Sequence, residues 1–260
     1  MMKIESIVKV MNFHALLRVD TARRQAEKYF EYEKELNNFA DIILNNRNFV
    51  LDKKTLRTNK NGKPLNIYIA NDLGFCGNFN SNVNKVMEQD LESEKIIIGK
   101  KIKKEHKNVL LAITKEEYSN NTKKIEEILY NSINQNRNSE INIIYNHYYN
   151  ISEIELIKKK ILPIDERKRE KEHKDDFVVE GNINQILINI IVLYLSYEIR
   201  VAQENSYASE NVMRQMLTKQ SLDKLKEIKE EDKKKQRKIN RQKSIKKTLE
   251  NFVNNMTKEE

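Results

Sequence analysis

Apolar side chains recur at three- and four-residue steps along the first part of the chain, from residue 3 to about residue 57, where neither Pro nor Gly occurs. Such spacing places them on one stripe of a helix, and the lack of helix breakers predicts that this helix is long. Its second half is more charged, so only a narrow seam can be buried. The stripe comprises Ile4, Ile7 and Met11, followed by Ala15 or Leu16 and by Val19 or Ala22.

The last part of the chain has the same character. Residues 182–260 also contain neither Pro nor Gly, and a continuous helix of that length spans on the order of 110 Å, far more than a domain of this size can cover. Neither long helix can bury its narrow apolar stripe alone, and pairing satisfies both. The pattern therefore predicts an antiparallel coiled coil of the N- and C-terminal segments.

Short strand-like runs alternate with helical runs in the middle third of the chain. This alternation predicts a small Rossmann-like α/β domain with mostly parallel strands, placed to one side of the coil. The strand-like runs are 65–70, 95–98, 109–113 and 141–145, and the helical runs are 81–91 and 122–133. We expect a coil helix at 1–58, the α/β domain at 59–165, a charged linker at 166–181 and the second coil helix at 182–260.

The composition agrees with long helices and a small core. Only 38% of the 260 residues are apolar and 33% are charged, with five Gly, two Pro and no Trp. One Cys excludes an intramolecular disulfide and suits a reducing compartment. The N-terminus lacks the unbroken apolar run of a signal peptide, and the apolar stretch from Ile183 to Leu195 is shorter than the roughly 20 residues of a membrane span. We expect a soluble, cytoplasmic protein.

The stretch NDLGFCGNFNSNV, residues 71–83, offers the first candidate chemistry. Gly74 and Gly77 lie between a strand and a helix, where backbone amides can hold an anion. However, the stretch lacks the Gly-Lys-Ser/Thr ending of a P-loop and the third Gly of a dinucleotide fingerprint, so a structural turn is favoured. Cys76 has no evident base, and the four His residues are scattered, which leaves no nucleophilic or metal-binding pattern. We expect no catalytic residue, metal or cofactor in this chain.

Positive charge gathers near the end of the chain. Between Lys224 and Lys247 there are 12 Lys and Arg against four Asp and Glu, which nearly accounts for the net charge of +9. The run is either a solvated helix face or a surface for an acidic partner. Aromatic residues that would stack on bases are missing from it, so nucleic acid is not the expected partner. The basic stripe consists of Lys233, Lys234, Lys235, Arg237 and Lys238.

Several stretches together resemble the γ subunit, the central stalk, of rotary F-type ATP synthases. NDLGFCGNFNSNV is similar to the segment SDRGLCGGFNSNV of that family, and KIIIGKK is similar to its next strand and turn. The late segments IIYNHYYN and ILPID, the helix start LYLSYEIRVAQENSYASENVMRQM and the ending INRQKSIKKTLENFV follow in the family's order. The resemblance extends over almost the whole chain, and the Gly-Phe-Cys-Gly segment is its most specific part.

The resemblance implies a non-catalytic rotor shaft. In that family an antiparallel coil stands inside a hexamer of α and β subunits, which hold ATP and Mg²⁺, and rotation is coupled to ATP synthesis or hydrolysis at the β sites. It also implies contacts with an ε-type subunit and a membrane ring, which would bring the protein to the inner face of the cell membrane. Residue by residue, it assigns a β-loop contact to Arg241 and Gln242, a structural turn to Gly74, Gly77 and Asn80, and coil packing to Ile4, Ile7, Met11, Ile245, Leu249 and Val253.

The chain also departs from the family pattern. It is shorter than usual for the family. LLRVDTA stands where the family has an MKMVA-like run, RQMLT stands where it has RMVAM, and NNMTKEE replaces its small-residue ending. These changes keep a first alternative open, a γ-like rotor of a divergent motor that drives a load other than a proton ring. The basic stripe keeps open a second alternative, a coiled-coil nucleic-acid-binding protein.

Overall fold

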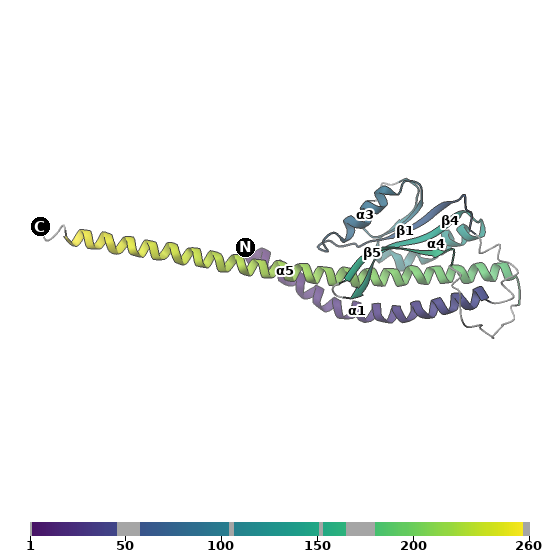
Figure 1. The fold of residues 1–260 in the computed structure, drawn as a ribbon, viewed down its shortest axis with the longest axis horizontal. Helices are drawn as coiled ribbons and strands as arrows, with labels where there is room; N and C mark the ends of the chain where they lie inside the picture. Colours follow the sequence, from purple (N-terminus) through teal and green to yellow (C-terminus); the bar gives the residue numbers. More distant parts are fainter. Residues whose placement is uncertain (1, 46–57, 104–106, 151–152, 165–179, 257–260) are drawn as a thin grey trace.

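The computed structural model describes residues 2–45, 58–103, 107–150, 153–164 and 180–256, with side chains left out at a few helix-end positions. A long helix, α5, runs through the whole molecule, with a second helix beside it and an α/β layer on its other side (Figure 1). The elements are α1 (Met2–Asn45), β1 (Lys63–Ile69), α3 (Phe79–Gln89), β2 (Glu94–Ile98), β3 (Val109–Ile113), α4 (Lys115–Asn134), β4 (Asn138–Asn150), β5 (Glu153–Leu162) and α5 (Ile183–Met256).

The α/β layer is a five-stranded sheet in the order β3-β2-β1-β4-β5. The first four strands are parallel, and β1 pairs with both β2 and β4, so that Ile67 lies beside Ile96 on one side and Ile143 on the other. Strand β5 pairs antiparallel with β4. The Rossmann-like, mostly parallel sheet expected from the sequence is therefore confirmed, whereas β5 as a long antiparallel edge strand was not foreseen.

Each face of the sheet is covered by helices. Alternate side chains of a strand point to opposite faces, so Leu65, Ile67 and Ile69 join one core with α4 and the first third of α5. Tyr68 and Ala70 point the other way and pack with Val83 and Met87 of α3, among others. The sheet is thereby attached directly to α5 rather than tethered to it by a linker.

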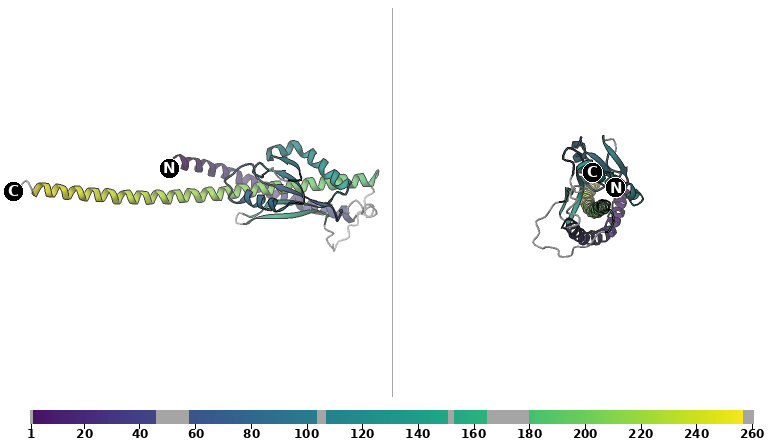
Figure 2. Two further views of the ribbon diagram at one scale, coloured as in Figure 1. Left: turned by 90° about the horizontal axis from the view of Figure 1, so that it is seen from above. Right: turned by 90° about the vertical axis from the view of Figure 1, so that its right-hand side faces the viewer.

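Helices α1 and α5 run antiparallel, and α5 lies between α1 and the sheet in Figure 1 and in the end-on view of Figure 2. Three small or β-branched side chains of α1, Ala15, Val19 and Ala22, are buried, and Ala22 packs with Ala208 of α5. Nearer the N-terminus the helices are joined by polar contacts. Thr218 Oγ1 donates to Asn12 Oδ1 at 3.0 Å, and Lys229 forms an ion pair with Glu5. The antiparallel coil is confirmed.

The buried stripe at the start of α1 differs from the predicted one. Ile4 and Ile7 are 59% and 60% exposed, and Met11 is only half-buried. The residues that face α5 there are Glu5, Val8 and Asn12. Coil packing by Ile4 and Ile7 is therefore wrong within this chain, because α1 is apolar on several sides and a three- and four-residue spacing fits more than one stripe.

The first third of α5 is the apolar part of the molecule. By length and composition alone, α5 contains a window apolar enough to cross a membrane, but 56% of that window is buried against the rest of the chain. Leu187, Ile191 and Leu195 are fully or almost fully buried under the sheet. A core helix has this pattern, and we interpret the segment in that way.

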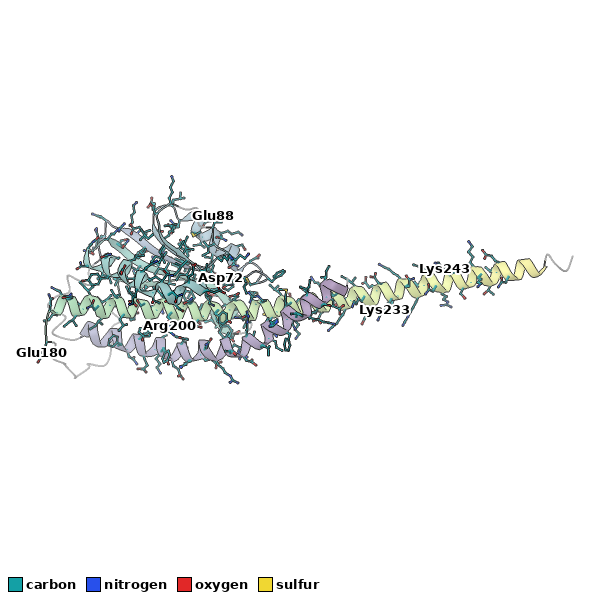
Figure 3. The ribbon with its side chains drawn as sticks, turned by 180° about the vertical axis from the view of Figure 1, so that it is seen from behind. Asp72, Glu88, Glu180, Arg200, Lys233 and Lys243 are labelled. Atoms are coloured by element: carbon teal, nitrogen blue, oxygen red, sulfur yellow. The ribbon has the colours of Figure 1, made fainter. Side chains whose placement is uncertain are left out.

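The last third of α5 extends past the N-terminal end of α1 as a single helix (Figures 1 and 3). Lys233 and Lys243 lie on this projecting part. Every described side chain from Glu230 to Asn251 is exposed. The predicted linker at 166–181 lies almost wholly outside the described residues, and the predicted division into four parts stays a prediction.

Candidate functional site

The turn after β1 is held by asparagine side chains. The backbone N–H of Asn71 donates to Asn80 Oδ1 at 3.1 Å, and Asn80 Nδ2 donates to the carbonyl of Leu73 at 3.4 Å and to Cys76 Sγ at 3.6 Å. Asn71 Nδ2 donates to the same sulfur at 3.7 Å. These bonds fold residues 71–80 over the buried Cys76 thiol. Burial raises the pKa of that thiol, which keeps it protonated and unreactive.

Arg214 attaches this turn to α5. Its Nε and Nη2 both donate to the carbonyl of Gly74 at 3.3 Å, and its Nη2 also pairs with Glu210 one helical turn earlier. Gly77 has φ of +60°, and a Cβ added there would lie 3.2 Å from Leu217 of α5. A side chain at this position would therefore be strained and would press against the helix. The structure thus places Gly74 and Gly77 in one turn packed on α5, which Asn80 holds from the start of α3.

The same turn presents apolar side chains to solvent. Phe75 is 72% exposed and has a φ of 61°, and Leu73 is also exposed. A groove of about 380 Å³ separates them from Val10 and Met11 of α1. Most of this groove is apolar, because both elements turn aliphatic or aromatic side chains toward it.

Helix α1 carries an exposed apolar band that continues from this groove. Large hydrophobic residues are normally scattered singly on a protein surface, whereas a contiguous set marks an interaction surface. Its most exposed members are Ile4, Ile7 and Phe13. The band consists of Ile4, Ile7, Val10, Phe13, Leu16 and Leu17.

The projecting part of α5 holds the predicted contact residues. Arg241 and Gln242 are exposed, as are all five residues of the basic stripe. Ile245 and Leu249 are 52% and 59% exposed, so the coil packing predicted for them is wrong within this chain, because α1 does not reach so far along α5. Val253 lies outside the residues whose side chains are described. The structure does not bring the tip residues together with the turn at Gly74, which lies beside Arg214 much earlier on α5.

A partly buried ion-pair cluster joins β5 to both long helices. Lys159 Nζ donates to Glu198 Oε2 of α5 at 2.7 Å and pairs with Glu33 of α1. Burial by itself would lower the pKa of Lys159, but the carboxylates of Glu198 and Glu33 outweigh burial and raise it. Glu198 is 1% exposed, and within the described residues its Oε1 has no hydrogen-bond partner. One cation of the sheet thereby contacts carboxylates on both helices of the coil.

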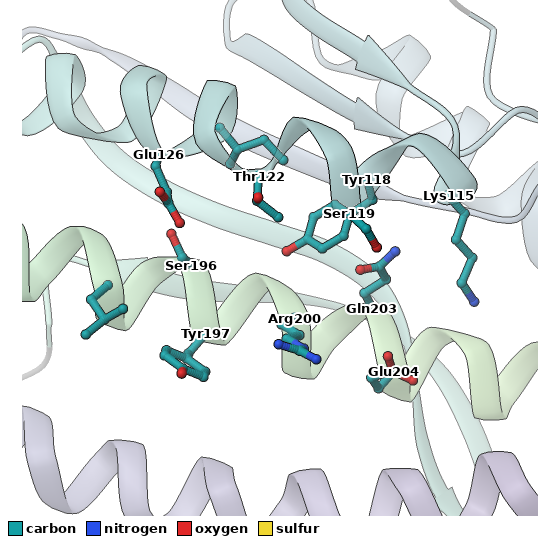
Figure 4. Close-up of a pocket in the computed structure, with 12 residues that line it drawn as sticks. Lys115, Tyr118, Ser119, Thr122, Glu126, Ser196, Tyr197, Arg200, Gln203 and Glu204 are labelled. Carbon is teal, nitrogen blue, oxygen red and sulfur yellow. The ribbon is translucent and has the colours of Figure 1, made fainter.

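A cavity of about 610 Å³ lies between α4 and α5 (Figure 4). Lys115 and Tyr118 of α4 line it from one side, and Arg200, Gln203 and Glu204 of α5 line it from the other. Cationic and anionic side chains are mixed around it. Among the described residues, no group of three or more His, Cys, Asp or Glu side chains is placed to hold a metal ion.

Sequence reasoning missed the Lys159 cluster, the exposed band on α1 and the apolar face of the turn. The cluster joins residues from three distant segments, which no local pattern reveals. For the band there was a signal, because apolar residues occupy more positions of α1 than one seam can bury. For the turn, the sequence shows Leu73 and Phe75 on either side of Gly74, but whether they are exposed depends on how the turn packs.

The chain is similar to proteins of one family along most of its length. A family model described as ATP synthase matches residues 1–255. The ATP synthase gamma chain of Clostridium novyi is 31% identical over 81% of this chain and 78% of its own length. That of Mycoplasma capricolum is 28% identical over 81% and 79%.

Solved structures show the same fold. A chain of the Tetrahymena thermophila mitochondrial ATP synthase, from a structure of its central stalk and c-ring, superposes with a TM-score of 0.57 at 17% identity, over 83% of this chain and 99% of that one. A chain of the Euglena gracilis mitochondrial ATP synthase superposes with a TM-score of 0.51 at 15% identity, over 92% and 94%.

Proposed function

The chain belongs to the family of ATP synthase gamma chains, and we propose that it is the central rotor shaft of an F-type rotary ATPase. The observation that carries this proposal is the shape of α5, an unbroken helix that is attached to the sheet at one end and projects alone at the other. A shaft needs this combination, because a load can bind at the end that carries the sheet, while the single projecting helix enters a partner.

The shaft acts by contact rather than by chemistry. Its exposed surface is asymmetric, with an apolar band on α1 and a basic stripe on α5. A surface that touches one conformation of a surrounding nucleotide-binding subunit better than another biases that subunit toward the favoured conformation. Rotation of the shaft then changes which subunit is biased, so rotation and nucleotide turnover drive each other.

The partners follow from this role. We infer that α- and β-type subunits surround the coil and hold ATP and Mg²⁺, and that Arg241 and Gln242 contact a β-subunit loop. The side chains of both residues are exposed on the projecting part of α5, which supports their availability. An ε-type subunit and a membrane ring would bind at the end that carries the sheet, and the complex would lie at the inner face of the cell membrane.

Purification of the chain under native conditions tests the proposal. We expect P-loop-bearing α- and β-type subunits to accompany it, and the complex to hydrolyse ATP while the chain alone does not. An Ile7→Asp variant should lose these subunits while keeping its own fold, since Ile7 is exposed in the free chain. If the wild-type chain is recovered without such subunits, the proposed role is wrong.

The same purification separates the two alternatives. A divergent motor would bring α- and β-type subunits but no ring or ε-type subunit, together with other proteins that form its load. A nucleic-acid-binding protein would bring neither, and its affinity for duplex DNA would fall steeply with salt, because many phosphate contacts release many counterions.

A further inference from the structure

Lys115 is the first residue of α4, and its backbone is fixed on two sides. Thr114 caps the helix, accepting from the N–H of Glu117 at 3.2 Å while Glu117 Oε2 accepts from the N–H of Thr114 at 2.8 Å. The N–H of Lys115 itself donates to the carboxylate of Asp72 at 3.1 Å. The position from which the Lys115 side chain starts is therefore well defined.

The amine of Lys115 lies in an unusual environment for a lysine. Its Nζ is 3.5 Å from the centre of the Tyr207 ring. In the described part of the chain no carboxylate lies within ion-pair distance of it. Burial of the amine is the largest influence and lowers the pKa of Lys115 to about 8. The positive charge of Arg214 also lowers this pKa. The carboxylates of Glu210, Glu204 and Asp72 act in the opposite direction but do not outweigh burial. A useful fraction of this amine is neutral near neutral pH.

The cavity between α4 and α5 gives a small molecule access to this amine. Lys115 stands at one end of the cavity, and its side chain reaches toward α5 near Glu204 (Figure 4). Arg200 lines the same cavity, together with the carboxylates of Glu126 and Glu204. The Arg200 guanidinium is always charged and matches the geometry of a phosphate group. Gln203, only 6% exposed, adds an amide to the wall. The cavity volume of about 610 Å³ exceeds what a small acyl phosphate requires.

We propose that Lys115 is a site of acylation by small acyl phosphates, with the donor seated in the cavity between α4 and α5. The lone pair of neutral Nζ attacks the carbonyl carbon, and a C–N bond forms. The C–O bond to the phosphate breaks, phosphate leaves with its electron pair, and the nitrogen loses one proton to solvent. This proposal goes beyond the rotor role and does not depend on it.

Acylation would change the joint between the α/β layer and the coil. The amide product is neutral, so the cation over the Tyr207 ring disappears, and with it an attraction that links α4 to α5. The product is also bulkier than the amine. Acylation would thereby weaken this contact between α4 and α5.

Competitive labelling tests the proposal on the full chain. The protein is treated with limiting acetyl phosphate, and the acetylated lysines are quantified by peptide mass spectrometry. Lys123 and Lys124 are exposed on the same helix and serve as matched controls. At about pH 7.5 we expect Lys115 to react at least about tenfold faster than either, because lysine amines in water are almost wholly protonated there. Equal rates for the three lysines, or no loss of the preference after unfolding in guanidinium chloride, would overturn the proposal.

A second variant examines the seat of the donor. Arg200→Ala should slow acetylation of Lys115 by acetyl phosphate several-fold, while leaving the rate with neutral N-acetylimidazole unchanged. If both reagents are slowed equally, or neither is, the cavity is not where the donor binds, and that part of the proposal fails.

Lys115→Arg should abolish the fast-reacting site without lowering the melting temperature, whereas Lys115→Gln, which imitates the acylated state, should lower it.

Discussion

Lys159 Nζ of β5 lies 2.7 Å from Glu198 Oε2 of α5, and the same amine pairs with Glu33 of α1. We expect Lys159→Met to destabilise the protein by about 3–5 kcal/mol, because it leaves the buried carboxylate of Glu198 without a cation. Lys158→Met is the matched control, since Lys158 is 51% exposed and its ion pair with Glu140 is 3.4 Å long, worth about 1 kcal/mol or less. Urea denaturation measures both, and equal losses would contradict the prediction.

Asp90 predicts how stability depends on acid. Burial alone would raise the pKa of Asp90, but hydrogen bonds from Ser93, Tyr68 and Asn66 outweigh it and lower that pKa to about 2. A carboxyl with a lowered folded-state pKa stabilises the fold above its unfolded pKa, and this stability is lost as pH falls. The protein should therefore lose roughly 2 kcal/mol between about pH 4 and pH 2 through this group.

Asp90→Asn isolates that contribution. The variant should be less stable than wild type at neutral pH and should lose less stability on acidification. Asp223→Asn, at an exposed position on α5, should leave the acid profile unchanged. Denaturant midpoints across the acid range are the measurement. If the Asp90 variant loses as much stability as wild type below about pH 4, another carboxyl causes the acid dependence.

Arg214 should control access to the Cys76 thiol. Arg214→Ala removes the donors to the Gly74 carbonyl, and because charge-assisted hydrogen bonds contribute about 1.5–3 kcal/mol, opening of the turn should become at least about tenfold more frequent. The rate of Cys76 modification by a maleimide should rise accordingly. Arg237→Ala, an exposed change on the basic stripe, should not alter it. An unchanged rate in Arg214→Ala would show that Asn71 and Asn80 hold the turn alone.

Val19 and Ile7 distinguish the seam of the coil from its outer surface. Val19→Asp should destabilise the isolated chain by several kcal/mol, because it buries a carboxylate against α5. Ile7→Asp places the same charge on an exposed position of the same helix and should barely change the melting temperature. Circular dichroism on heating measures both. A large effect of Ile7→Asp on the isolated chain would restore Ile7 to the seam.

Arg241 and Gln242 should matter through their position more than through charge. Arg241 offers a planar fork of donors and Gln242 a donor and an acceptor, so together they suit one orientation of a partner loop. Changing both to Ala should sharply reduce the steady-state ATPase rate of the assembled complex. Changing Lys234 and Lys235 to Ala should cost much less, as screened surface charges contribute about 0–1 kcal/mol each. Equal losses at two salt concentrations would mean that the stripe acts by bulk charge.

The long-range architecture was predictable because two strong local signals coincide. Residues 182–256 lack helix breakers, and the strand-like runs around Ile67, Ile97 and Ile143 are short and rich in β-branched residues, so helix and strand are each favoured locally. Strand β5 was missed because its Glu and Lys residues alternate irregularly with aliphatic ones, as an exposed edge strand allows.

The side-chain environment was less predictable than the architecture. The stripe of α1 was misjudged because Ile4 and Ile7 obey the same spacing as Val8 and Asn12, and only the partner helix decides which set is buried. Lys159 was hidden because its two carboxylates come from opposite ends of the chain. Lys115 gave no signal, since its environment depends on the ring of Tyr207, far along α5.

Helix α5 is surrounded by other elements along its first part and stands alone along its last part. From Ile183 to about Thr218 it is flanked by the sheet and by α1, whereas from Lys233 to Met256 it stands alone for roughly 35 Å. Bending and twisting stiffness rise steeply with the thickness of a rod, so the same torque deforms the two parts unequally. Elastic deformation therefore concentrates in the single helix, which acts as a spring in series with a rigid base. Under torque the base therefore moves as one body, and the single helix takes up the twist between base and tip.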